Sequence, residues 1–188
     1  MRRYLIIHVI IILSQVNGSG QSYGLAFSSH EAPFEKRTSL DISPGDSLCL
    51  AKNFELGFDF HFIPNHKDYF GYVLRIISNG NKNIDIIYNH KLKLFRIIVE
   101  DNFSAIKFSL DSPGMYRQWT QFRLIFNSQK RTLQFTVNGK NAGVATLPSV
   151  LSCFKFLWGA NDSPGFDTKD LPAMEIKDIR ISEEGKLK

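Results

Sequence analysis

The sequence has little cysteine, no strong excess of charge of either sign, and no apolar run long enough to span a membrane. Two cysteines among 188 residues are too few for a small disulfide scaffold or for a tetrahedral zinc site. The formal net charge is only +5, and Arg2 and Arg3 at the extreme N-terminus contribute to it. Because the sequence also lacks a basic stripe and a known reader motif, we expect no nucleic-acid partner.

Catalytic and cofactor signatures are missing as well. The sequence contains no Gly-x-Ser-x-Gly nucleophile elbow, no Cys/His arrangement of a thiol enzyme, and no glycine-rich phosphate loop before a helix. His61 and His66 stand near Asp59 and Asp68, but their spacing matches no known set of metal ligands. These four residues are therefore interpreted as strand and loop surface positions.

The first twenty residues have the organisation of a secretory signal peptide. A basic start is followed by an apolar run over residues 4–13 and by small residues such as Gly18. The run is about half of the roughly 20 residues that a membrane span requires, so cleavage is favoured over anchoring. We expect a signal peptide over residues 1–20 and one domain over residues 21–188. The protein is then exported to the periplasm, the cell surface or the extracellular space, with no membrane span left after cleavage.

The chain has enough apolar material for a well-filled core, because 43% of it is hydrophobic and 16 residues are phenylalanine. Apolar and polar residues alternate with a period of two, most clearly over residues 53–62, which predicts strands with one buried face. The strands are bounded by turn signals such as Asn138-Gly139. The pattern predicts an all-β, two-sheet antiparallel sandwich. It assigns nine residues to the interior: Phe54, Phe58, Phe60, Phe122, Leu124, Phe126, Leu133, Phe135 and Val137.

Two local features stand out within this pattern. The alternation of apolar residues breaks at Lys177-Asp178 and then resumes, which predicts a β-bulge. Cys49 and Cys153 lie in apolar strands, one early and one late. In an oxidising compartment they are able to form a disulfide, but two buried free thiols fit the sequence equally well.

Several of the predicted strands also resemble a known family. Trp119-Thr-Gln-Phe-Arg-Leu-Ile-Phe126 is followed by a polar turn and by Leu133-Gln-Phe-Thr-Val-Asn-Gly-Lys140. This hairpin is similar to the central hairpin of concanavalin A-like lectin/glucanase and laminin-G-like domains, in which a Trp opens one strand and V-[ND]-G closes the next. Residues 156–159 and 174–181 resemble the last two strands of that family. The resemblance implies a jelly roll for carbohydrate or protein-ligand recognition, sometimes with calcium and, in some branches, for glycoside hydrolysis.

The acidic residues do not match the catalytic pattern of the family. Its glucanases carry a Glu-x-Asp-x(x)-Glu strand, and glycoside hydrolysis requires two carboxyl groups roughly 5–9 Å apart. Here Glu55 and Asp59 are four residues apart, with Gly57 where the family has an acid, and Glu175 and Asp178 straddle the expected bulge. We therefore expect no catalytic residues and no enzymatic activity.

Two places remain as candidate ligand sites. One is the loop over residues 161–170, which contains several oxygen-bearing side chains: Asn161, Asp162, Asp167 and Asp170. Such oxygens suit sugar hydroxyls or calcium, with Asp162 and Asp167 as the metal ligands, although an ordinary turn-rich connection has the same composition. The other is the polar face that carries Glu55, Asp59 and His61. The rings of Tyr69, Tyr72, Tyr88 and Tyr116 are candidates for sugar stacking, but packing between strands is the favoured explanation for each single tyrosine.

The leading hypothesis from the sequence is therefore a secreted, non-catalytic binding module for glycans, without an obligatory cofactor. The alternative is a structural or sensory interaction domain that packs against a partner domain in a larger multidomain exported protein. A glycoside hydrolase is the third hypothesis.

Overall fold

The structure of the chain is a computed structural model. It describes residues 24–29, 31–42, 47–50, 53–63, 70–78, 82–89, 91–100, 102–109, 118–159, 171–183 and 186–187. Within these ranges the chain forms strands and one short 3-10 helix, η1 (Phe34–Lys36). No helix of the described part is long and apolar enough to cross a membrane.

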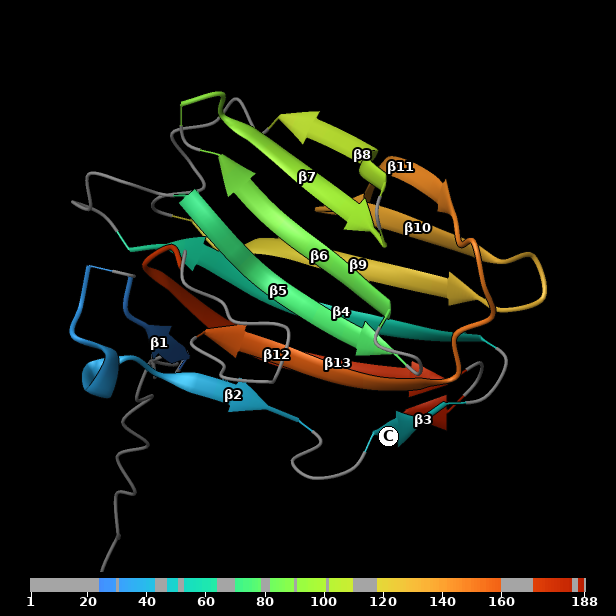
Figure 1. Cartoon of the computed structure of the whole chain (residues 1–188), viewed down its shortest axis with the longest axis horizontal. Coiled ribbons are helices and arrows are strands. Elements are labelled where there is room, and N and C mark those ends of the chain that lie inside the picture. The colour runs from blue at the N-terminus through green and yellow to red at the C-terminus, as the bar shows by residue number, and fades with distance from the viewer. Residues whose placement is uncertain are drawn as a thin grey trace, which may run out of the picture.

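The strands form two antiparallel sheets that face each other as two layers (Figure 1). Sheet A has the order β1-β13-β4-β9-β10-β11, and β14 pairs with β13. Its strands are β1 (Leu25–Phe27), β4 (Asn53–Phe62), β9 (Thr120–Asn127), β10 (Thr132–Val137), β11 (Lys140–Thr146), β13 (Met174–Glu183) and β14 (Lys186–Leu187).

Sheet B has the order β2-β12-β5-β6-β7-β8, and β3 pairs with β12. Its strands are β2 (Ser39–Asp41), β3 (Leu48–Cys49), β5 (Phe70–Ser78), β6 (Lys82–Asn89), β7 (Leu94–Val99), β8 (Asn102–Ser109) and β12 (Cys153–Gly159). The two-sheet antiparallel sandwich expected from the sequence is thus confirmed.

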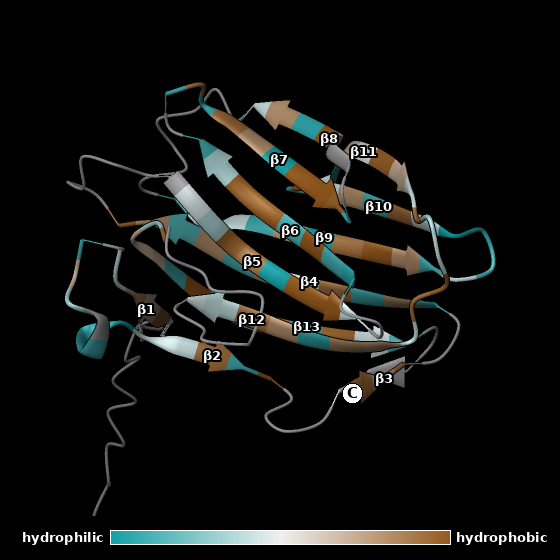
Figure 2. Ribbon diagram, viewed as in Figure 1, coloured by the Kyte–Doolittle hydropathy of each residue, from teal (hydrophilic) through white to brown (hydrophobic). Residues whose placement is uncertain are grey.

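The core lies between the sheets and is rich in phenylalanine. Hydrophobic and hydrophilic residues alternate along the strands (Figure 2), and in β4 every second residue is buried. Phe54 stacks on Phe126 with ring centroids 4.2 Å apart, and Phe60 lies at the same distance from Phe122. All nine residues that the alternation assigned to the interior are buried.

The register also confirms the expected bulge in β13. Lys177 is opposite Asp59 and Arg180 is opposite Gly57, so the register shifts between Lys177 and Arg180. Asp178 lies within the bulge and has a φ of +52°, a left-handed conformation that Asp adopts more readily than most residues other than glycine. Asp178 and Arg180 of this bulged segment line one groove together with Gly57 of β4.

Cys49 and Cys153 are joined by a disulfide across 104 residues of sequence. They are direct partners in the antiparallel pairing of β3 with β12. Of the two alternatives that the sequence left open, the structure therefore has the bonded one.

We expect Gly159→Ala to lower the free energy of unfolding by about 2–4 kcal/mol, because it combines backbone strain with crowding. Gly159 has a φ of +74°, and an added Cβ would meet the backbone oxygen of Thr38 and the ring of Phe27. Gly139→Ala is the matched control, since Gly139 has a φ of +75° with nothing within 4 Å of its Cβ position. Urea unfolding of both variants separates the two causes, and equal losses would show that crowding contributes nothing.

Candidate functional site

The outer face of sheet A carries the polar residues that the sequence placed on one face. Glu55, Gly57, Asp59 and His61 alternate with the buried residues of β4 and therefore point away from the core. All four are partly exposed. The structure thus brings Glu55, Asp59 and His61 into one row along β4.

Glu55 is held by a guanidinium of the neighbouring strand. Arg123 of β9 donates from Nε to Oε1 at 2.7 Å and from its terminal nitrogen to Oε2 at 2.6 Å. These hydrogen bonds raise the pKa of Arg123 above its ordinary value, although desolvation by burial opposes them. Because both charges are partly exposed, the pair contributes little stability. The ion pair matters because it holds the carboxylate of Glu55 and the guanidinium of Arg123 side by side.

A groove opens beside this pair, over the middle of β4. Its volume is about 290 Å³, close to the lower end for small-ligand sites. A Cβ added at Gly57 would find only ordinary contacts at 3.8–4.0 Å, so the missing side chain leaves the floor of the groove open. The lining comes from β4, β9 and the bulge of β13, and its polar residues are Glu55, Asp59, Gln121, Arg123, Asp178 and Arg180.

The far end of the row is filled by side chains that contact one another. His61 donates from Nε2 to Glu175 Oε2 at 2.8 Å, and its ring meets the ring of Trp119 edge to face with centroids 4.4 Å apart. The ammonium group of Lys177 lies 4.2 Å from the centre of the Trp119 ring. Because the side chains of His61 and Lys177 both contact the indole ring of Trp119, this ring packs against its neighbours on the surface of the sheet. It is therefore not a free platform for a sugar.

Glu55 and Asp59 both line the groove over Gly57. Gly57 stands between them on β4, so the strand lacks the middle acid of the Glu-x-Asp-x(x)-Glu pattern. Glu55 is also bound by Arg123. The arrangement of β4 is suited to hydrogen bonding of a polar ligand.

The other predicted site, the loop with Asn161, Asp162, Asp167 and Asp170, lies outside the described residues. Calcium binding by Asp162 and Asp167 therefore stays a prediction. Within the described ranges, no three His, Cys, Asp or Glu residues come together in a way that holds a metal ion.

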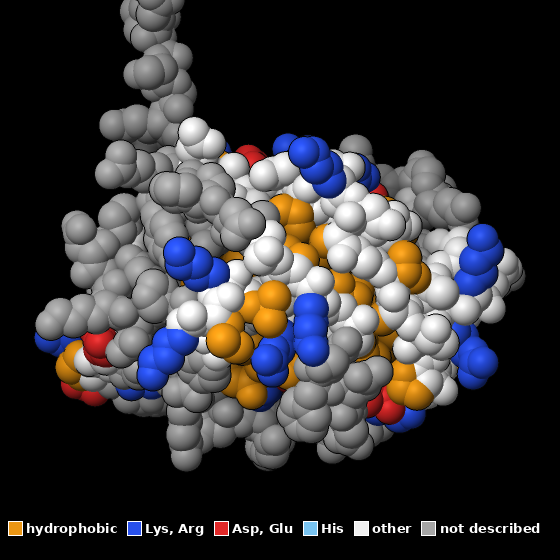
Figure 3. Space-filling view, turned by 90° about the horizontal axis from the view of Figure 1, so that it is seen from above, with side chains coloured by type: hydrophobic (Ala, Val, Ile, Leu, Met, Phe, Trp, Pro, Cys, Tyr) orange, Lys and Arg blue, Asp and Glu red, His pale blue; other side chains and the backbone are white. Residues whose placement is uncertain are grey.

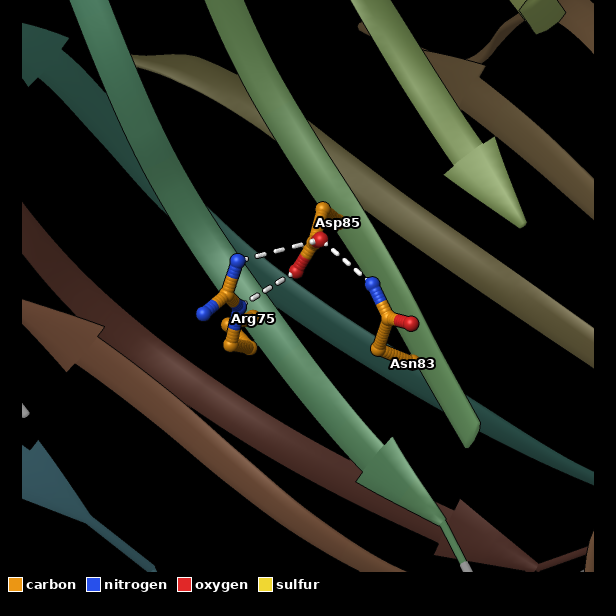
Figure 4. Close-up of polar contacts among 3 residues, drawn as sticks. All are labelled: Arg75, Asn83 and Asp85. Atoms are coloured by element: carbon orange, nitrogen blue, oxygen red, sulfur yellow. Dashed lines mark hydrogen bonds and ion pairs between the residues drawn. The ribbon is translucent and has the colours of Figure 1, made fainter. Parts of the chain in front are cut away.

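A buried polar cluster lies on the outer side of sheet B (Figure 4). Arg75 of β5 donates to both carboxylate oxygens of Asp85 of β6, at 2.7 and 3.3 Å. Asn83 adds a hydrogen bond of 2.6 Å to the same carboxylate, and the guanidinium lies 4.1 Å from the centre of the Tyr72 ring. Arg75 is only 6% exposed and Asp85 only 3%. The cluster is a rigid polar centre in a sheet that is otherwise strongly apolar.

Sequence reasoning missed this cluster. The available signal was a single charged residue inside each of two apolar runs, residues 73–77 and 84–87. The pairing of these two charges follows only from the register that sets Arg75 opposite Asp85. Of the tyrosines, Tyr88 is fully buried, so it packs in the core and is no stacking platform.

No protein-family model and no curated protein matches the sequence. Solved structures do match the fold. The carbohydrate recognition domain of Emp46p in its potassium-bound form has a TM-score of 0.56 at 9% identity, over 76% of this chain and 76% of that one. An endo-1,3-beta-glucanase from Streptomyces sioyaensis has a TM-score of 0.56 at 7% identity, over 76% and 68%.

An enzyme of another class also matches. The alginate lyase AlgAT5 of polysaccharide lyase family 7 has a TM-score of 0.50 at 14% identity, over 78% of this chain and 62% of that enzyme. This chain therefore spans less than two thirds of the lyase. At such identities the likeness of all three proteins concerns the fold alone.

Proposed function

We propose that this chain, which has the concanavalin A-like jelly-roll fold, is an exported, non-catalytic module that binds carbohydrate in the groove over Gly57. The groove carries the proposal, because it sets carboxylates, guanidinium groups and an amide around an open floor. Sugar hydroxyls donate and accept hydrogen bonds, and planar polar side chains of this kind satisfy both roles. The laminin-G-like detail of the resemblance stays a prediction.

The fixed geometry of the groove supports this function. Glu55 and Arg123 hold each other in place, and rigid polar groups bind a ligand at a smaller entropic cost than mobile ones. Asp59 and Gln121 are direct neighbours across β4 and β9, so acceptors and donors alternate across the floor. The neighbours of the fold include a carbohydrate recognition domain and two enzymes named for polysaccharides.

Two observations support export and the absence of catalysis. The disulfide between Cys49 and Cys153 is the kind of bond that persists in oxidising compartments, in agreement with the signal peptide expected over residues 1–20. Glu55 is bound by Arg123, and Gly57 stands where the glucanase pattern has an acid, which supports binding without catalysis.

Gly57→Val tests the groove directly, because it places a branched side chain on the open floor. The Cβ position has only ordinary contacts, and valine favours strands over glycine. We expect the variant to lose at least tenfold in glycan affinity, about 1.4 kcal/mol, with an unchanged or higher Tm. The measurement is a glycan array followed by titration of the best ligand.

Gln134→Val is the matched control. Gln134 lies on β10, opposite Ile125 of β9 in the same sheet, and does not line the groove. Equal affinity of wild type and Gly57→Val would remove the groove from the proposal, and no binding to any glycan would favour an interaction domain instead. Cleavage of a bound glycan by the wild type would contradict the absence of catalysis.

A further inference from the structure

Two basic side chains lie opposite each other in sheet B, away from the groove. Arg96 of β7 and Lys107 of β8 are direct partners in the antiparallel register. Ile97 and Ile106, which follow and precede them, are part of the hydrophobic core, so Arg96 and Lys107 point to the outer face by alternation. Directly opposed side chains are about 4.5–5.5 Å apart at Cβ, and like charges at this distance destabilise a sheet.

Within the described part of the chain, no acidic group compensates these two charges. Neither Arg96 nor Lys107 takes part in an ion pair there. The carboxylate of Asp85, on the adjacent strand β6, is already bound by Arg75 and Asn83. Among the described residues, the repulsion between Arg96 and Lys107 is therefore not cancelled by any opposite charge.

Arg96 also carries a hydrogen-bond donor without an acceptor. Its Nε is buried and has no hydrogen-bond partner among the described residues. A buried donor without a partner has lost its hydration and gained nothing in return. An anion that binds the terminal nitrogens of this guanidinium would form directed hydrogen bonds with it and would also screen the charge of Lys107. The repulsion between the two cations therefore favours an anionic ligand.

The residues around Arg96 and Lys107 indicate which class of ligand bears the anionic group. Tyr72 of β5, Ile87 of β6, Arg96 and Lys107 form one row across four strands. Figure 3 looks onto the edge of the molecule where β8 and β11 lie, and there Lys and Arg side chains lie among and around apolar ones, while Asp and Glu lie at the margin. Two cations beside an aromatic and an apolar residue are few for a nucleic-acid backbone, whose binding relies on many phosphate contacts.

We infer that Arg96 and Lys107 bind the carboxylate or sulfate groups of an acidic polysaccharide on the outer face of sheet B. The planar guanidinium binds such oxygens with directed hydrogen bonds, and the ammonium adds a point charge. The inference rests on the proposed function only in taking the ligand to be a glycan, because it uses another sheet and other residues.

The test compares the full chain with Arg96→Gln, Lys107→Gln and the double variant. The probes are polygalacturonate for carboxylate, heparin for sulfate, dextran as a neutral chain, duplex DNA, and inorganic sulfate alone. We expect the double variant to lose at least tenfold in affinity for the acidic chains, and wild-type binding to weaken as salt is raised. Lys130→Gln is the control, since Lys130 is an exposed lysine in the turn between β9 and β10 of the other sheet.

Stability distinguishes binding residues from structural ones. Because the two like charges repel, Lys107→Gln should keep or raise the Tm, whereas a structural lysine would lower it. Unchanged affinity of the double variant for the acidic chains, or equal binding of dextran and polygalacturonate, would overturn the inference. Tighter binding of duplex DNA than of every acidic glycan would overturn it too.

The same data keep this inference separate from the proposed function. If Gly57→Val no longer binds neutral glycans while the double variant still binds acidic ones, the groove is supported and the Arg96–Lys107 site is contradicted. If only the double variant fails to bind acidic glycans, the Arg96–Lys107 site is supported, whichever glycan the groove binds.

Discussion

Removal of the disulfide between Cys49 and Cys153 is expected to lower the free energy of unfolding by about 4–5 kcal/mol. The bond closes a loop of 104 residues, and in the chain-entropy account such a long loop restricts the unfolded chain strongly. For a domain of this size the Tm should fall by roughly 10–15 °C. Urea unfolding of the Cys49→Ser/Cys153→Ser variant measures the effect.

Reduction of the wild-type protein serves as the first control, because it breaks the bond without a change in sequence. Ser152→Ala is the second, since it alters a neighbouring exposed residue and leaves the bond intact. A loss below about 1 kcal/mol in the double serine variant would mean that the unfolded chain is already compact around these two segments.

The second large effect is expected at the buried pair of sheet B. Asp85→Leu leaves the guanidinium of Arg75 without its carboxylate, and Arg75→Met leaves the carboxylate of Asp85 without its cation. Each single change should cost about 3–5 kcal/mol, because a buried charge loses its partner. The double variant should be far more stable than the sum of the two losses predicts, since it buries no charge at all.

The exposed pair of sheet A provides the comparison. Glu55→Gln removes one charge of the pair with Arg123, whose side chain is 42% exposed, and solvent screening limits the expected loss to about 1 kcal/mol or less. Thermal unfolding of all variants under one condition tests the contrast. Additive losses at Arg75 and Asp85 would show that the two charges do not depend on each other.

The strands of the sandwich were predictable where side chains alternate strictly. The run over residues 53–62 gave the bounds of β4, and the break at Lys177-Asp178 gave the bulge of β13. The short strands β1, β2 and β3 have two or three residues each, too few for any period. In β11 the burial pattern is irregular, so it has no alternation to detect.

The candidate site was predictable only in part, because a sequence does not give the register between strands. Alternation places Glu55 and Asp59 on one face, but the contacts with Arg123 and Gln121 come from the pairing of β4 with β9. For the same reason the opposition of Arg96 and Lys107 cannot be read from residues that are eleven positions apart. The groove itself depends on Gly57, whose role is visible only once the bulge of β13 lies beside it.

The arrangement of β2 and β3 has a consequence for self-association. Both strands pair with β12, β2 near Leu157 and β3 near Cys153, so two very short strands cover the edge of β12. A long, flat edge strand is a template on which another chain adds as a further strand, whereas a short one is not. Because the disulfide ties β3 to β12, an oxidised chain resists edge-to-edge aggregation. A reduced chain exposes part of β12 whenever β3 detaches.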